Sequence, residues 1–93
     1  MSIQVLLPGV LADLAGGARR LTLHPPPADV AALLTTIGDR HPTLARRLCD
    51  ETGAIRRHVN IYVDGTDVRG EQGLATPVPD GAVVQVLPSV AGG

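Results

Sequence analysis

The sequence predicts an α+β domain in which one main helix covers a mixed β-sheet. Short runs of alternating apolar and polar residues towards both ends of the chain predict strands, and one apolar stripe with helical spacing predicts the helix between them. With 93 residues, the chain has room for a single core. Because 44% of the residues are apolar and Tyr62 is the only aromatic residue, we expect this core to be aliphatic.

Two strands are expected before residue 25. The first spans residues 3–7 and has apolar side chains on one face with a two-residue period, and the second spans residues 19–24 and alternates between apolar and polar side chains. The connection between them carries Leu11 and Leu14, which we expect to tuck under the edge of the domain. The two strands form a hairpin, with Ile3, Val5, Leu7, Leu21 and Leu23 facing inward and Arg20, Thr22 and His24 facing outward.

The main helix is expected over residues 28–41. Prolines 25–27 end the preceding strand, because they lack backbone donors. Asp29 then places a negative charge in the first helical turn, where the helix dipole favours it. The apolar side chains form one stripe that we expect to face the sheet, namely Val30, Leu33, Leu34 and Ile37.

A second, shorter helical segment follows the main helix. Pro42 breaks the main helix, because proline removes a backbone hydrogen bond and clashes with the preceding turn. We expect residues 43–48 to add one more turn, with Thr43 as its cap and with Leu44 and Leu48 facing inward.

Three more strands complete the expected sheet. One spans residues 57–63, the hairpin signal Asp64-Gly65 leads into a short return strand at 66–69, and the last strand spans 82–87. With the last strand between the first and the third, it runs parallel to the first, which the long helical crossover permits. This order of elements predicts the β-grasp, or ubiquitin-like, arrangement.

The tail at residues 88–93 ends on Gly92-Gly93. Terminal glycines are often simply frayed. Two positions without side chains can also enter a narrow channel in extended form, with the terminal carbonyl carbon open to attack. At about 3.3 Å per residue, the six residues reach roughly 20 Å, far enough to enter the active site of another protein. We therefore expect a β-grasp domain at residues 1–87 that presents a flexible tail.

Strand parity places a small group of side chains on the outer face of the sheet, near the root of this tail. Singly exposed apolar residues are ordinary on soluble domains. A cluster of them beside a reactive terminus suggests docking. We predict a partner-binding surface formed by Leu6, Asn60, Tyr62, Gln85 and Leu87.

Composition excludes several classes of function. The net charge is −1, with eight arginines and no lysine, whereas a nucleic-acid binder normally shows a basic excess and stacking aromatics. A single cysteine excludes an internal disulfide. No apolar run approaches the roughly 18 residues of a membrane span, and the first residues lack the charged region of a signal peptide. We therefore expect a cytoplasmic protein that binds neither nucleic acid nor membrane.

The sequence offers no residue set for catalysis by the chain itself. It contains no glycine-rich phosphate loop, carboxylate pair or nucleophile with a base. Cys49 stands beside Asp50 and Glu51, whose charge would raise the thiol pKa, so a structural role is favoured. The three histidines lack partners at zinc-site spacing, so we predict no metal. Three arginine pairs are interpreted as solvated surface or, alternatively, as contacts with an acidic partner: Arg19-Arg20, Arg46-Arg47 and Arg56-Arg57.

Five segments in the second half of the chain form a specific pattern: Val59-Asn60-Ile61-Tyr62-Val63, Asp67-Val68-Arg69, Gly73-Leu74-Ala75-Thr76, Pro79-Asp80-Gly81 and Leu87-Pro88-Ser89-Val90-Ala91-Gly92-Gly93. With these segments the chain resembles the ThiS/MoaD family of ubiquitin-like sulfur carriers, most closely its cysteine-biosynthesis carriers. The likeness is dense from residue 59 onward. Before residue 59 it rests on the first connection and on the order of the elements.

The resemblance implies a carrier and not an enzyme. An E1-like adenylyltransferase of the MoeB/ThiF type would use Mg-ATP to form an acyl-adenylate at Gly93, and sulfide or persulfide sulfur would then leave a thiocarboxylate there. Gly92 would provide clearance, and Val90 and Ala91 would contact the partner. The chain itself would bind no cofactor. ATP with Mg²⁺ and pyridoxal phosphate would belong to partners, which include a pyridoxal-phosphate-dependent cysteine synthase and a JAMM-type metalloprotease.

Other functions are compatible with the same residues. Within the family, the sulfur can go to molybdopterin, thiamine or a sulfur-containing natural product. From another class, Gly93 can form isopeptide bonds with lysines of target proteins, as in a ubiquitin-like modifier. A third alternative is a plain interaction module whose tail is inert.

Overall fold

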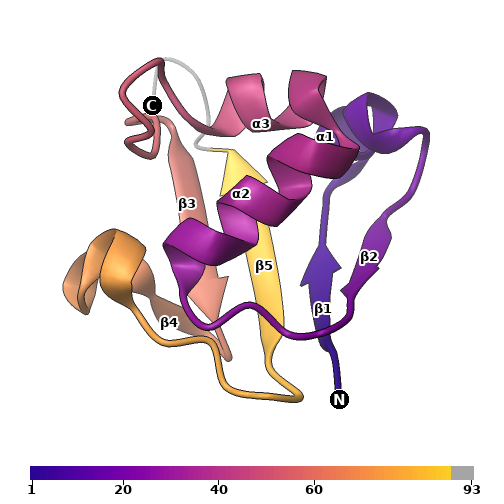
Figure 1. The fold of residues 1–93 in the computed structure, drawn as a ribbon. Helices are drawn as coiled ribbons and strands as arrows, with labels where there is room; N and C mark the ends of the chain where they lie inside the picture. The colour runs from indigo at the N-terminus through magenta and orange to yellow at the C-terminus, as the bar shows by residue number, and fades with distance from the viewer. Residues whose placement is uncertain (89–93) are drawn as a thin grey trace.

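A computed structural model describes residues 1–88 of the chain and contains a five-stranded mixed sheet with helices packed on one face (Figure 1). The strands are β1 (Ile3–Leu6), β2 (Arg20–Leu23), β3 (Val59–Val63), β4 (Thr66–Asp67) and β5 (Val83–Pro88). They lie side by side in the order β2-β1-β5-β3-β4. This order confirms the predicted β-grasp arrangement. The predicted tail at residues 89–93 lies outside the described residues.

Strand β5 occupies the middle of the sheet. It runs parallel to β1, with Val5 opposite Val84, and antiparallel to β3, with Ile61 opposite Val86. A parallel neighbour requires a long crossover connection, which the helical segments of the chain supply. The prediction that the last strand inserts between the first and the third is therefore confirmed.

Helix α2 (Val30–Arg40) lies across the inner face of the sheet (Figure 1). Asp29 is its N-cap, and its Oδ1 accepts a hydrogen bond from the backbone N–H of Ala32 at 2.8 Å. The helix therefore begins two residues later than predicted, with Asp29 before the first turn and not in it. It ends before the predicted His41, because a residue that precedes a proline avoids the helical conformation.

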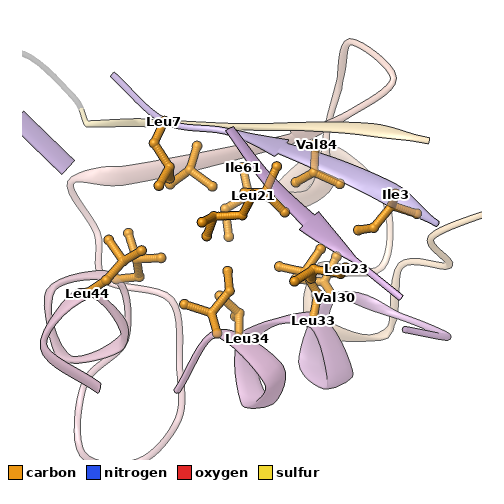
Figure 2. Close-up of a cluster of buried hydrophobic side chains, with 14 of the residues drawn as sticks. Ile3, Leu7, Leu21, Leu23, Val30, Leu33, Leu34, Leu44, Ile61 and Val84 are labelled. Carbon is orange, nitrogen blue, oxygen red and sulfur yellow. The ribbon is translucent and has the colours of Figure 1, made fainter. Parts of the chain in front are cut away.

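The apolar stripe of α2 faces the sheet and is buried, as predicted (Figure 2). Leu33 and Ile37 have no exposed surface, and in Figure 2 the side chain of Leu34 points toward Leu21 and Ile61 on the sheet. The buried hydrophobic residues of the described chain are all aliphatic. Burying one such side chain stabilises the fold by about 1.5–3 kcal/mol, so the stripe is a main source of stability.

Helix α3 (Pro42–Leu48) corrects the predicted cap of the second helical segment. Pro42 is the first residue of α3. An N–H at this position has no acceptor within the helix, so a proline there costs no intrahelical hydrogen bond. Thr43 consequently lies inside the helix, and no side chain caps it. The prediction of Thr43 as the cap was wrong, whereas Leu44 and Leu48 are fully buried, as predicted.

The connection between the first two strands contains a short helix that the sequence did not reveal. Residues Gly9–Ala12 form helix α1, and Asp13–Ala15 form a 3₁₀ turn, η1. Leu11 is buried and Leu14 packs against the core, which confirms that this segment tucks under the edge of the domain. Four residues are too few to display a helical period, so composition alone could not indicate α1.

The return strand after β3 is shorter than predicted. The turn itself is confirmed, with positive φ at Asp64 (50°) and Gly65 (85°). Strand β4 then ends at Asp67, whose Oδ1 accepts a hydrogen bond from the backbone N–H of Arg69 at 2.9 Å. This bond turns the chain into a 3₁₀ helix, η2 (Val68–Gly70), in place of the predicted strand residues.

Candidate functional site

The outer face of the sheet brings together the five side chains that were predicted to bind a partner. In one row, Gln85 of β5 pairs with Leu6 of β1 and with Tyr62 of β3. In the next row, Leu87 of β5 pairs with Asn60 of β3. Because a strand rises about 3.3 Å per residue, the two rows lie roughly 7 Å apart. We call these five residues the open-face patch, and their role in binding remains a prediction.

The two sides of β5 differ sharply in burial. Val84 and Val86 have no exposed surface, whereas Gln85 is exposed and Leu87 keeps 40% of its surface in contact with solvent. The open-face patch combines two leucines and an aromatic ring with two side-chain amides. A tyrosine in such a patch offers apolar area together with a hydroxyl group. This mixture suits a surface that faces water in the free domain and is covered when a partner binds.

The root of the tail lies at the end of the open-face patch. Strand β5 continues one residue beyond its predicted end, and Pro88 pairs with Val59 at the start of β3. Strand β1 accompanies β5 only as far as Gln85, so Pro88 has a strand neighbour on one side only and its missing N–H is tolerated. The predicted reacting residue, Gly93, and the tail residues predicted to assist its activation, Val90, Ala91 and Gly92, lie outside the described residues.

Arg69 fixes the start of β3 beside this root. Its guanidinium donates hydrogen bonds to Asn60 Oδ1 at 2.8 Å and to the backbone carbonyl of Arg56 at 2.8 Å. Charge-assisted bonds of this kind are stronger than neutral ones. Asn60 therefore has a structural partner besides its predicted place in the open-face patch. The sequence did not indicate this contact, because it placed Arg69 on a strand.

Cys49 lies between α3 and the following loop and is half-buried. Burial raises the pKa of the Cys49 thiol, and the nearby Asp50 carboxylate raises it further, while Arg56 acts in the opposite direction. The predicted direction of the shift is confirmed, although burial and not charge is its main cause. A thiol with a raised pKa is a poor nucleophile at neutral pH.

Members of two of the three predicted arginine pairs meet at one place, namely both residues of Arg46-Arg47 and the first residue of Arg56-Arg57. Arg46 and Arg47 of α3 face Arg56 and His58 across an open depression of about 470 Å³, which Thr43 completes. We call these five residues the basic depression. Arg56 and Arg57 precede β3, so Arg57 lies outside the strand that was expected to begin with it. No local sequence signal could reveal the cluster, because it depends on how α3 approaches the chain before β3.

Within residues 1–88, no group of three histidine, cysteine or acidic side chains could hold a metal ion. None of the helices in this part of the chain is both long and apolar enough to cross a membrane.

The fold and the site together define the class of the protein: a β-grasp domain of the ubiquitin-like carriers, with its last strand in the middle of the sheet. The profile of the ThiS family matches residues 5–93, and the chain belongs to this family. It is 35% identical over 95 residues to the sulfur carrier protein CysO of Mycobacterium tuberculosis, with 100% of each chain covered.

Two further similarities extend this picture. The chain is 38% identical over 66 residues to small archaeal modifier protein 3 of Haloferax volcanii, with 71% of each protein covered. A chain in the crystal structure of the Amycolatopsis orientalis BexX/CysO complex superposes with a TM-score of 0.84 at 33% identity, covering 98% of this chain and 99% of that one. Relatives named sulfur carriers are small carrier modules and not catalysts, which supports a carrier role for this chain.

Proposed function

We propose that this chain carries sulfur as a thiocarboxylate on Gly93 and delivers it to a biosynthetic acceptor in cysteine biosynthesis. The observation that carries the proposal is the ThiS-family match, which extends through residue 93 and so includes the diglycine. The full-length similarity to CysO favours the cysteine-forming branch. The chain acts as a protein co-substrate of its partner enzymes.

The chemistry begins with activation of a poor electrophile. An E1-like adenylyltransferase of the MoeB/ThiF type binds Mg-ATP, and a carboxylate oxygen of Gly93 attacks the α-phosphorus while pyrophosphate leaves. Hydrosulfide then attacks the carbonyl carbon of the acyl-adenylate, and AMP leaves. The product is a thiocarboxylate whose sulfur is a nucleophile attached to a protein. Consumption of ATP by the partner places these steps in the cytoplasm.

The tail and the open-face patch have separate tasks in this scheme. Gly92 and Gly93 have no side chains, so they can thread a narrow channel, and Val90 and Ala91 contact its walls. The open-face patch docks the domain, which holds the tail at the channel and raises its effective concentration there. This division is supported by the position of Leu87, one residue before the end of β5.

The acceptor and later partners follow from the similarity to CysO. We propose a pyridoxal-phosphate-dependent synthase that transfers the sulfur to an aminoacrylate, and a JAMM-type metalloprotease that releases the cysteine. Pyridoxal phosphate and the protease metal belong to those partners.

Intact mass spectrometry tests the proposal directly. The chain is incubated with an E1-like partner, Mg-ATP and sulfide, and exchange of one oxygen for sulfur adds about 16 Da. A variant that lacks Gly92 and Gly93 is the matched control and gains nothing. Gly93→Ala keeps the fold and reacts more slowly, because a methyl group crowds the channel. An unchanged mass under conditions that convert an established carrier would overturn the proposal.

A second function is favoured by the similarity to small archaeal modifier protein 3. In that case the acyl-adenylate at Gly93 is attacked by a lysine amine of a target protein, and an isopeptide bond forms as AMP leaves. Because the chain has no lysine, it cannot form chains on itself through lysine side chains. The test is a search for conjugates in extracts of the host. Lysine peptides linked to Gly93 would establish protein modification, whereas their absence would leave only the sulfur-carrier function.

A further inference from the structure

The basic depression gathers positive charge on a protein whose net charge is −1. Three of the eight arginines and His58 line it, and none of its five lining residues carries a carboxylate. Asp50 and Glu51 line a neighbouring hollow that shares Arg46 and Arg56. Arg47 and His58 line the basic depression only, so they are its most independent members.

Arg56 is positioned by hydrogen bonds to backbone carbonyls, which do not neutralise its positive charge. Arg56 Nε donates to the backbone carbonyl of Arg46 at 2.9 Å, and the backbone N–H of Arg56 donates to the carbonyl of Leu48 at 2.9 Å. Arg69 holds the carbonyl of Arg56 from the other side. The segment before β3 is thus fixed against α3. Groups that are already ordered lose less entropy when a partner binds.

The basic depression lies beside the root of the tail. His58 directly precedes Val59, and Val59 is the strand partner of Pro88, the last described residue of β5. At about 3.3 Å per residue, the five residues after Pro88 reach roughly 17 Å. An enzyme that holds Gly93 in its active site therefore lies within roughly 17 Å of Pro88, which is near enough for its surface to reach this depression.

We propose that the basic depression binds an acidic surface, rich in aspartate or glutamate, beside the channel entrance of the adenylylating partner. This inference rests on the proposed function, because that function brings the partner to the tail. A neutral partner surface would remove water from several cations and return no interaction for the lost hydration. Carboxylates offset this loss by forming charge-assisted hydrogen bonds with the cations. Charges at the rim of an interface act mainly by accelerating association at low salt.

The test compares two matched charge reversals, Arg47→Glu in the basic depression and Arg19→Glu outside it. Both arginines are exposed, and both changes alter the charge by the same amount. Association with the MoeB/ThiF-type adenylyltransferase of the source organism is followed at ionic strengths of about 0.02 M and about 0.5 M, which span weak and strong screening. Arg47→Lys, which keeps the charge, serves as the rescue variant.

We expect Arg47→Glu to lower the association rate constant by about 5- to 10-fold at low salt, with the difference vanishing at high salt. Arg19→Glu and Arg47→Lys stay within about 2-fold of wild type. Arg19→Glu leaves the maximal adenylation rate at saturating carrier unchanged, and circular dichroism verifies that each variant is folded.

The possible failures are distinguishable. When the wild-type chain is adenylated but Arg47→Glu associates as fast as Arg19→Glu at low salt, the acidic-surface proposal is overturned and the proposed function stands. A defect of Arg47→Glu that persists at high salt also overturns it, since packing and not charge would then be responsible. When wild type is not adenylated at all, both proposals fail.

Discussion

The two faces of β5 show how one strand serves two purposes. Val84 and Val86 are sealed under α2, whereas Gln85 and Leu87 face outward in the open-face patch. The inner face determines whether the domain folds, and the outer face is available for binding. Side chains alternate along a strand. A shift of one residue in the register of β5 would therefore move its buried side chains to the outer face and its exposed side chains to the inner face.

The position of β5 adds a mechanical reason for this arrangement. The strand that carries the tail is paired on both sides, with β1 and with β3. If the tail enters a partner's channel, as proposed, tension on it would act on a strand with two neighbours and not on an edge strand, which fewer hydrogen bonds would hold.

The largest expected effect lies on the inner face. Leu33→Ala removes a fully buried side chain of α2 and leaves a cavity, so we expect the free energy of unfolding to fall by about 2–5 kcal/mol. Urea denaturation followed by circular dichroism measures this loss. Leu87→Ala, the same substitution on the outer face, is the control and should cost about 1 kcal/mol or less. If both variants lost comparable free energy of unfolding, the inner and outer faces would not differ in their contribution to stability.

The outer face should show the opposite pattern. Tyr62→Ala removes the only aromatic ring of the open-face patch, and we expect kcat/KM for partner-dependent ATP-pyrophosphate exchange to fall about 10-fold, or about 1.4 kcal/mol. The unfolding free energy should change by about 1 kcal/mol or less. Thr22→Ala, on the outer face of β2 at the edge of the sheet, is the control and should leave kcat/KM unchanged. Normal exchange by Tyr62→Ala would argue against docking through this patch.

The sequence predicted the inner face well because burial follows periodicity. The stripe from Val30 to Ile37 repeats at helical spacing, and β3 and β5 alternate with a period of two, so the placement of these side chains needs no tertiary information. The placement of the open-face patch residues on the outer face was predicted correctly for the same reason, whereas their role in binding stays a prediction. The five residues occupy strand positions that alternate with the buried positions. Once the buried positions are predicted, the outward-facing positions follow.

The sequence failed where particular side-chain contacts, local or long-range, decide the structure. Arg69 leaves the expected strand because Asp67 captures its backbone N–H, and its guanidinium then reaches nine residues back to Asn60. The basic depression needs α3 and the chain before β3 to meet, which no local pattern records. A local side-chain bond that ends a strand and contacts between side chains distant in sequence are therefore what only the structure supplied.

The smallest expected effect lies in a loop that belongs to neither face. The pKa of the Asp50 carboxyl is lowered, first by the hydroxyl of Thr52 and then by the backbone N–H of Thr52, with further contributions from Ala54 and Arg56. Because the folded pKa is depressed, the stability from these bonds is present above the unfolded value near pH 4 and is lost as pH falls through the folded value. Asp50→Asn does not titrate there, so its melting temperature should decline less than that of wild type between about pH 5 and pH 2.5. Glu51→Gln is the neighbouring control with the same change in charge. If its pH profile matches that of Asp50→Asn, general charge governs acid stability, and the hydrogen bonds of this loop do not.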